Sequence, residues 1–168
     1  MSFIRVKRRM LKGHEVRYAY LVKNSWDRKS SSPRQKVSKY LGRVFTPEKN
    51  ELDFVSYIEE EPQDYLSRHG RNRILKDLVL WELKRHDADV QYSADRRTIL
   101  KRNKEIVLQI NEGYLCGYTI RRLFNFNAKE EDERETGLRL AEMMTEAGIQ
   151  VPREIFVGLF DKVAGTEY

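Results

Sequence analysis

The chain is short of cysteine and of long apolar runs, and each shortage excludes a class of structure. Cys116 is the only cysteine among 168 residues, so no disulfide can form within the chain. We expect this thiol to be a small buried apolar residue in a reducing compartment. No apolar stretch approaches the roughly 18 residues that a membrane span needs. The first ten residues mix basic and apolar side chains, unlike a signal peptide. We therefore predict a cytoplasmic protein with no membrane partner.

The side chains that usually build catalytic or metal sites are also scarce. The three histidines, His14, His69 and His86, are far apart in the sequence, without the paired His or Cys spacing of a metal site. No glycine-rich phosphate loop occurs. We interpret the acidic runs 59–61 and 130–133 as solvated faces rather than cation sites. The sequence therefore predicts a protein that is not an enzyme and that needs no metal or other cofactor.

Acidic residues are almost missing from the first fifty positions. This segment holds 14 of the chain's 32 Lys and Arg but only Glu15, Asp27 and Glu48 as acids, so it carries a charge of +11. The remaining residues carry −5, and the net charge of +6 averages two unlike parts. Such an asymmetry within one chain indicates a polyanionic partner, usually nucleic acid, for the basic part.

Apolar and basic side chains alternate along the first ten residues, which predicts a strand with one wetted, positive face. After a turn at 11–14, we expect further strands over 16–23 and 35–44, the last ending near Gly42. The sequence thus predicts a basic antiparallel β-meander over residues 1–46. The polar segment 24–33 exceeds the usual hairpin connection, so we expect a long, mobile loop there.

The rest of the chain, 47–168, is predicted to be a helical body, so the expected fold class is α+β. Thr46, Pro47 and Glu48 have the pattern of a helix start, and we expect helix from there to Ile58 with a break near Pro62. A small second antiparallel meander is expected at about 90–110. Further helices are predicted over 71–85, over 112–126, from a cap at Asn127 to Ala147, and after Pro152.

The predicted basic sheet has the side chains that nucleic acid requires. On a strand, Arg5, Lys7 and Arg9 would lie about 7 Å apart on one face, close to the spacing of successive phosphates. Tyr18 and Tyr20 lie among the cations and can stack on unpaired bases. The candidate nucleic-acid-binding residues are Arg5, Lys7, Arg9, Lys12, Arg17, Trp26, Arg28, Lys29, Arg34, Lys36, Lys39, Tyr40 and Arg43.

Trp26 has two open interpretations. It lies in the predicted polar loop, followed by Arg28, Lys29 and a run of serines. A large aromatic in such a segment is more commonly an anchor that pins the loop to the body. The alternative is a ring held out to stack on an unpaired base.

Part of the basic segment resembles a known module. The runs Phe3-Ile4-Arg5-Val6, Tyr20-Leu21-Val22 and Arg34-Gln35-Lys36-Val37, the last leading into Tyr40-Leu41-Gly42-Arg43, resemble the amino-terminal β segment of insertion-sequence transposases with a retroviral-integrase-like core. The resemblance covers about a quarter of the chain. It implies a module that faces nucleic acid, with Arg34, Lys36 and Arg43 where that segment is basic.

The same resemblance does not imply transposition. Those enzymes carry a large domain with an acidic triad, for which a chain of 168 residues has no room. The remaining residues look similar to small archaeal proteins without an assigned activity. That second resemblance implies no chemistry for this chain.

Three functional hypotheses remain open from the sequence. The first is non-catalytic binding of nucleic acid, RNA or a ribonucleoprotein rather than duplex DNA, because the aromatics suit unpaired bases and no groove-reading helix is evident. The second is an adaptor that binds a protein partner through acidic residues 130–135 and the apolar face of the last helix. The third, a small nuclease, would need several carboxylates beside the basic sheet.

Overall fold

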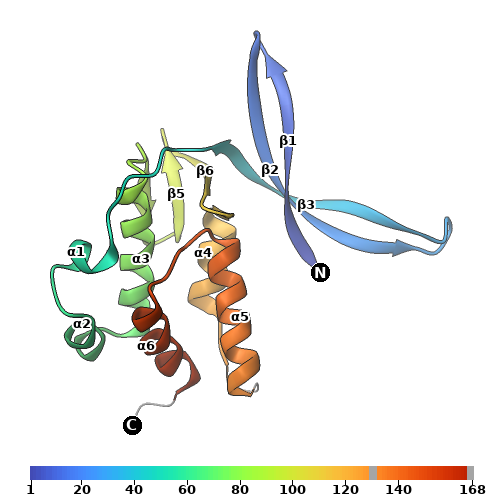
Figure 1. Ribbon diagram of the computed structural model, residues 1–168. Coiled ribbons are helices and arrows are strands. Elements are labelled where there is room, and N and C mark those ends of the chain that lie inside the picture. The colour runs from blue at the N-terminus through green and yellow to red at the C-terminus, as the bar shows by residue number, and fades with distance from the viewer. Residues whose placement is uncertain (129–131, 166–168) are drawn as a thin grey trace.

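The computed structural model, which describes residues 1–128 and 132–165, confirms the α+β fold class. It contains a seven-stranded mixed sheet and six helices, most of them in the carboxyl-terminal half. The sheet has the strand order β1-β2-β3-β6-β5-β4, with β7 paired to β6. Figure 1 shows the helices gathered at one end of this sheet. Over the described residues, the structure contains no helix that is both long and apolar enough to cross a membrane.

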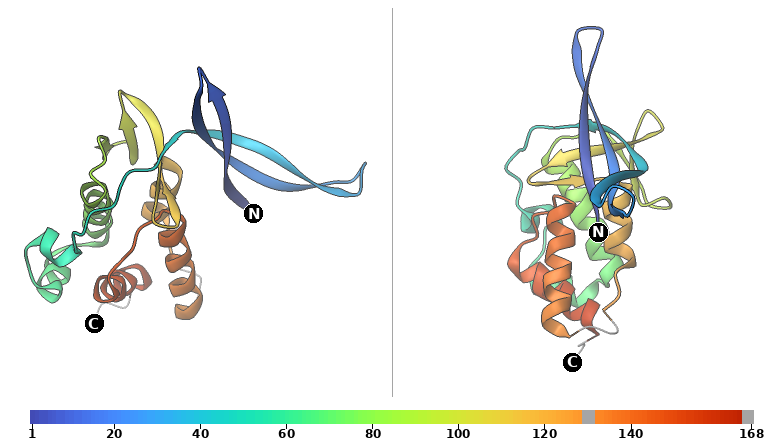
Figure 2. Two further views of the ribbon diagram at one scale, coloured as in Figure 1. Left: turned by 45° about the horizontal axis from the view of Figure 1, so that its top comes forward. Right: turned by 90° about the vertical axis from the view of Figure 1, so that its right-hand side faces the viewer.

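The first three strands form the expected basic antiparallel meander. They are β1 (Ser2–Leu11), β2 (His14–Asp27) and β3 (Ser32–Phe45). β2 pairs with β1 over 14–23 and with β3 over 17–27, so only its middle is paired on both sides. The two ends leave the sheet as two-stranded hairpins, which we call the first arm, with its turn at Lys12 and Gly13, and the second arm, with its turn at 28–31. Both arms stand away from the helices in Figure 1 and in the left view of Figure 2.

Two β-bulges explain why the arms diverge. The register between β2 and β3 shifts twice and leaves Leu41 and Ser38 without partners across the sheet. The Ser38 hydroxyl donates a hydrogen bond of 3.0 Å to the carbonyl of Leu21, which stabilises one bulge. Because bulges bend a strand and increase its twist, the end of the second arm turns away from the first.

The expected loop over residues 24–33 is wrong. β2 and β3 continue through it, with Trp26 paired to Pro33 and Asp27 paired to Ser32. Proline is tolerated because β3 is an edge strand at this point. The Asp27 carboxylate closes the short turn by accepting hydrogen bonds of 3.0 Å from the Lys29 backbone and from the Ser30 hydroxyl. These local bonds stabilise a segment whose composition resembles a loop.

The second meander is confirmed, and it is joined to the first. β4 (Gln91–Ser93), β5 (Thr98–Lys101) and β6 (Lys104–Ile110) are antiparallel neighbours, and β6 also pairs with β7 (Gly113–Leu115). The end of β3, residues 43–45, pairs in parallel with residues 106–108 of β6. Gly42 lies at this junction with φ +139°, and a Cβ there would lie 2.6 Å from the carbonyl oxygen of Glu105. Only glycine permits so close an approach.

The helices follow the predicted order with three corrected starts. Their bounds are α1 Phe54–Ile58, α2 Pro62–Arg68, α3 Arg71–Arg85, α4 Gly117–Asn125, α5 Glu133–Glu146 and α6 Arg153–Ala164. The expected helix start at Thr46 is wrong, because the Thr46 hydroxyl is a partner of Arg17 and the carboxylate of Asp53 caps α1 at the Ser56 backbone amide instead, at 2.9 Å.

The other two corrected starts lie in the second half. α4 begins at Gly117, later than the expected 112, because residues 113–115 form strand β7. Asn127 is not the cap of α5: Asp132 accepts a 2.8 Å hydrogen bond from the backbone amide of Glu135. Residues 129–131, which include part of the predicted acidic run, lie outside the described residues. The predicted helix 71–85 is confirmed as α3.

The hydrophobic core divides into a large cluster in the helical body and a small one at the junction. The large cluster packs α3, β6, α5 and α6 together through residues such as Ile74, Leu78, Leu108, Leu140 and Ile155. The small cluster joins the first three strands to the body through Ala19, Leu41, Val44, Val107 and Cys116. Cys116 is 1% exposed, as predicted, and burial raises the pKa of its thiol.

A buried carboxylate ties the connection between α5 and α6 to α3. Glu82, which is 0% exposed, accepts a 2.9 Å hydrogen bond from the Gln150 backbone amide and one of 3.3 Å from the Asn111 side chain. Arg85 lies 3.5 Å from the same carboxylate. A buried charge held by several donors is stable in place, but it would be costly to leave unpaired.

Candidate nucleic-acid interface

One face of the basic sheet combines tyrosines with cations. Directly opposed residues of an antiparallel pair lie on the same side of the sheet. The register opposes Arg5 to Tyr20 and Lys7 to Tyr18, and on the other side of β2 it opposes Tyr20 to Tyr40 and Tyr18 to Arg43. We call this surface the tyrosine face; it consists of Arg5, Lys7, Arg9, Tyr18, Tyr20, Tyr40 and Arg43.

The three tyrosines form one aromatic cluster. The Tyr40 ring lies 5.4 Å from the Tyr20 ring and 6.3 Å from the Tyr18 ring, centroid to centroid. The Lys7 ammonium lies 5.1 Å above the Tyr20 ring. Tyr40 is 53% exposed. Partial burial, followed by its two tyrosine neighbours, raises the pKa of Tyr40, so the exposed ring stays neutral and can stack on a base.

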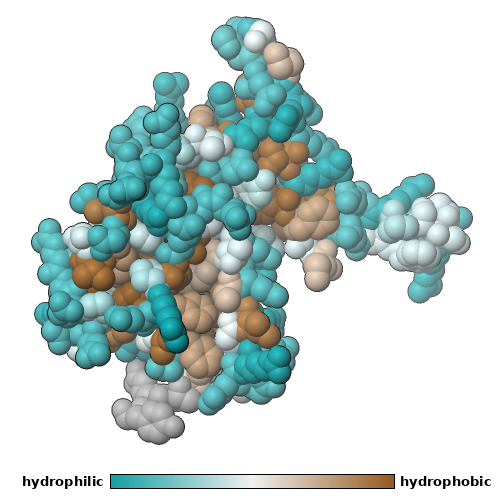
Figure 3. All heavy atoms as spheres, viewed as in Figure 1, coloured by the Kyte–Doolittle hydropathy of each residue, from teal (hydrophilic) through white to brown (hydrophobic). Residues whose placement is uncertain are grey.

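The opposite face of the same strands packs on the body. Ile4, Val6 and Leu21 contact the junction cluster, together with Tyr114 and Tyr118 from β7 and α4. The alternation of apolar and basic residues along β1 therefore has the predicted effect, because the apolar set contacts the body and Arg5, Lys7 and Arg9 are exposed. Figure 3 shows the same division, with hydrophilic residues along the arms and hydrophobic ones gathered at their base.

The cations of this module are almost all without acidic partners. Of the predicted candidates, only Arg34 forms an ion pair within the described residues, with Asp27 at 3.0 Å. The candidates are exposed except Arg17, which is half-buried and donates hydrogen bonds to Gln109 and to Thr46. Arg17 thus links β2 to the body, while Lys12, Arg28, Lys29, Lys36 and Lys39 extend the positive surface onto the arms and the edge of β3.

Two lysines of the second arm directly face each other. The register opposes Lys23 to Lys36, and no ion pair within the described part of the chain neutralises either one. Opposed like charges destabilise an antiparallel pair by roughly 0.2–1 kcal/mol. A bound phosphate between these lysines would remove that cost.

Trp26 is held out from the sheet, so the anchor interpretation is wrong. It lies on β2 and is 66% exposed. Strand alternation places it on the same side as Asn24, which is opposed to Gln35. Gln35 in turn accepts a 2.6 Å hydrogen bond from Arg5. Trp26 therefore continues the tyrosine face onto the second arm.

The sequence analysis missed a group of cations on the body. The turn between β5 and β6 carries Lys101, Arg102 and Lys104, which face a hollow of about 740 Å³ beside Tyr18 and Tyr40. The parallel pairing of β3 with β6 brings them there. Nothing in the local pattern of either segment indicates this pairing, because the segments are about sixty positions apart.

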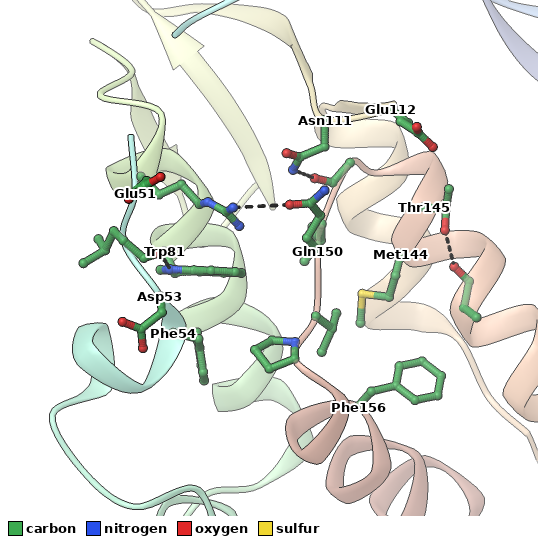
Figure 4. A pocket seen from close by; sticks show the side chains of 17 residues that line it. Glu51, Asp53, Phe54, Trp81, Asn111, Glu112, Met144, Thr145, Gln150 and Phe156 are labelled. Carbon is green, nitrogen blue, oxygen red and sulfur yellow. Dashed lines mark hydrogen bonds between the residues drawn. The ribbon is translucent and has the colours of Figure 1, made fainter. Parts of the chain in front are cut away.

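A second hollow, of about 970 Å³, lies on the helical body between α3 and α5. Figure 4 shows Trp81 from α3 and Met144 from α5 pointing into it from opposite sides, with Phe156 from α6 below. The exposed acids Glu51, Asp53 and Glu112 lie around it, and the Arg85 guanidinium stacks 4.6 Å from the Trp81 ring. Figure 3 shows hydrophobic residues on this side of the body.

The described residues offer little to metal chemistry. Among them, no group of three or more His, Cys, Asp or Glu side chains could hold a metal ion. His86 is buried, with Nδ1 at 2.8 Å from the Glu82 carbonyl. Within the acidic run 59–61, Glu60 forms ion pairs with Arg68 and His69.

No family model, curated protein or solved structure matches this chain. The resemblance of the basic segment to a transposase module therefore stays a prediction.

Proposed function

We propose that this protein binds nucleic acid without catalysis, through the tyrosine face and the two arms, in the cytoplasm. The observation that carries the proposal is an exposed sheet on which unpaired cations alternate with exposed aromatic rings. The cations serve the phosphates, and the rings serve the bases. This division of roles suits RNA or a ribonucleoprotein better than duplex DNA.

Phosphate contacts supply most of the affinity in this proposal. We expect about four to six such contacts, which give a slope of log affinity against log salt between about −3 and −5. The cations need not break internal ion pairs before they bind, because only Arg34 has an acidic partner among the described residues. The free energy of binding is therefore not offset by lost salt bridges.

The aromatic rings favour unpaired bases. Tyr40 and Trp26 are both more than half exposed, and stacking of a base on such a ring contributes about 1–3 kcal/mol. A two-stranded ribbon such as either arm also fits the major groove of B-DNA, which is about 12 Å wide. The tyrosine cluster would have no base to contact there, so we favour the single strand.

Fluorescence anisotropy tests the proposal. The full chain is titrated into a labelled single-stranded RNA of about 12 nucleotides, the matching DNA strand and the matching duplex, between about 50 and 200 mM salt. We expect both single strands to bind more tightly than the duplex, with RNA the tightest. Absence of binding to all three at the lowest salt would refute the proposal, and tighter binding of the duplex would refute the preference.

The hollow on the helical body favours a second candidate function, that of an adaptor. Its apolar lining and its acids, Glu51, Asp53 and Glu112, are complementary to a peptide with apolar and basic side chains. Selection from a random peptide library with the full chain tests this function. Enriched basic and apolar peptides that no longer bind a Met144→Glu variant would support it, and enrichment unaffected by that change would oppose it.

A further inference from the structure

The hollow beside the tyrosine face has one wall from each part of the molecule. Tyr18, Tyr40, Arg43 and Phe45 of β2 and β3 line one side, and Lys101, Arg102, Lys104 and Glu105 of the β5–β6 hairpin line the other. Its volume of about 740 Å³ lies within the usual range for small-ligand sites. Four of these side chains are cations and one is an acid, so the hollow is electropositive.

Aromatic rings and cations are interleaved within the hollow. The Phe45 ring lies between the Arg43 guanidinium, at 5.0 Å, and the Lys101 ammonium, at 5.2 Å. Tyr40 is the exposed ring on the opposite side. The hollow therefore offers stacking surfaces with positive charge at the edge, as single-strand-binding proteins do.

The lysines of the turn repeat the like-charge arrangement of the second arm. The register opposes Lys101 directly to Lys104. Lys101 lies 3.6 Å from the exposed Asp89, whereas Lys104 forms no ion pair within the described residues. Two opposed ammonium groups beside an aromatic hollow are suited to a phosphate group.

The backbone fixes the two walls relative to each other. Residues 43–45 are hydrogen-bonded to residues 106–108, and Gly42 allows the two strands to approach closely. Arg102 and Asn103 complete a two-residue turn with φ of 50° and 61°, which is the geometry of a tight type I′ hairpin. The cations therefore lie on a short, defined loop.

We infer that a single nucleic-acid strand crosses from the tyrosine face onto the β5–β6 turn and places one unpaired base in this hollow. The inference rests on the proposed function and adds a site on the body that takes a base and its neighbouring phosphates. A base can enter only when it leaves its helical stack, which is free in a single strand and costly in a duplex. The hollow therefore selects single strands.

The test compares single-strand and duplex binding for the full chain and a turn variant. Arg102→Asn with Lys104→Gln removes two charges, and asparagine is well accepted at a positive φ. The matched control removes two exposed cations of α3 and α6, Lys84→Gln with Arg153→Gln. We expect the turn variant to bind the single strand about tenfold more weakly, with a salt slope shallower by about 1.4, and the control to bind like the parent.

A base scan then tests the hollow itself. An abasic site is moved along the oligonucleotide, and each strand is titrated with the parent and with Tyr40→Ala. We expect one position at which loss of the base weakens binding to the parent by about fivefold or more, and no such position with Tyr40→Ala.

Each failure points to a different error. If the turn variant binds like the parent while Arg5→Ala/Lys7→Ala/Arg9→Ala binds weakly, the strand does not cross onto the turn and only this inference is wrong. If every abasic position is equivalent for the parent, no base enters the hollow. If the parent binds no single strand, the proposed function itself is wrong.

Discussion

The basic sheet and the helical body of this protein differ in how their charges are satisfied. In the body, Glu82 and Asp77 are buried and held by several donors, including the Tyr65 hydroxyl at 2.9 Å from Asp77. On the sheet, exposed cations face one another or an aromatic ring. Internally paired charges serve the fold, whereas unpaired exposed charges suit a partner of opposite sign. The comparison assigns stability to the body and binding to the sheet.

The largest expected effect comes from the body and should affect stability alone. Glu82→Ala leaves Arg85 and the Gln150 amide without their buried partner, so we expect a loss of about 3–5 kcal/mol in the free energy of unfolding. Chemical denaturation measures this loss, and Glu142→Ala, an exposed glutamate of α5, is the control. A change of less than about 1 kcal/mol would show that the Glu82 network does not hold the body together.

The second effect comes from the sheet and should affect binding alone. The variant Arg5→Ala/Lys7→Ala/Arg9→Ala removes three phosphate contacts, so we expect a salt slope shallower by about two to three. Its melting temperature should match that of the parent, since none of the three side chains has an ion-pair partner in the described structure. The control Lys84→Ala/Arg134→Ala/Arg153→Ala changes the net charge equally on the body. Equal loss of binding in both variants would show that net charge, and not the sheet, determines affinity.

The third effect lies at the junction and should affect both properties. Gly42→Ala introduces a Cβ 2.6 Å from the Glu105 carbonyl oxygen at a positive φ, so β3 must move away from β6. We expect a loss of about 1–3 kcal/mol in stability and weaker single-strand binding, measured by denaturation and anisotropy. Gly13→Ala is the control, because it also has a positive φ but no neighbour within 4 Å. If both variants bind equally well, the junction does not position the binding surface.

The smallest effect should separate stability from binding within the second arm. Lys23→Gln removes one of two opposed lysines, so we expect a gain of about 0.2–1 kcal/mol in stability and a salt slope shallower by about one. Lys39→Gln is the matched control, because Lys39 is opposed to Leu21 and its loss relieves no repulsion. A loss of stability in Lys23→Gln would contradict the repulsion argument.

Side-chain periodicity predicted the local structure where burial determines it. The alternation along β1 placed Ile4 and Val6 toward the junction, and the apolar stripe of 71–85 identified α3. The segment 24–33 was mispredicted because serine, asparagine and proline favour turns, while the pairing of Trp26 with Pro33 depends on the whole hairpin.

The predicted binding set was similarly partial. Charge and aromatic content were enough to select Arg5, Lys7 and Tyr40 from the sequence, and the structure places all three on one face. The cations of the β5–β6 turn were missed because a parallel pairing between distant segments has no local signal. Composition locates a charged module, but the partner surface that it acquires depends on tertiary contacts.

Photocrosslinking tests the central claim most directly. The full chain is irradiated with a single-stranded RNA that contains 4-thiouridine, and the crosslinked peptides are identified by mass spectrometry. The account predicts crosslinks at Tyr18, Tyr20, Tyr40 or Trp26, the rings available to bases on the sheet. Crosslinks confined to α5 and α6, with none on β1 to β3, would contradict it.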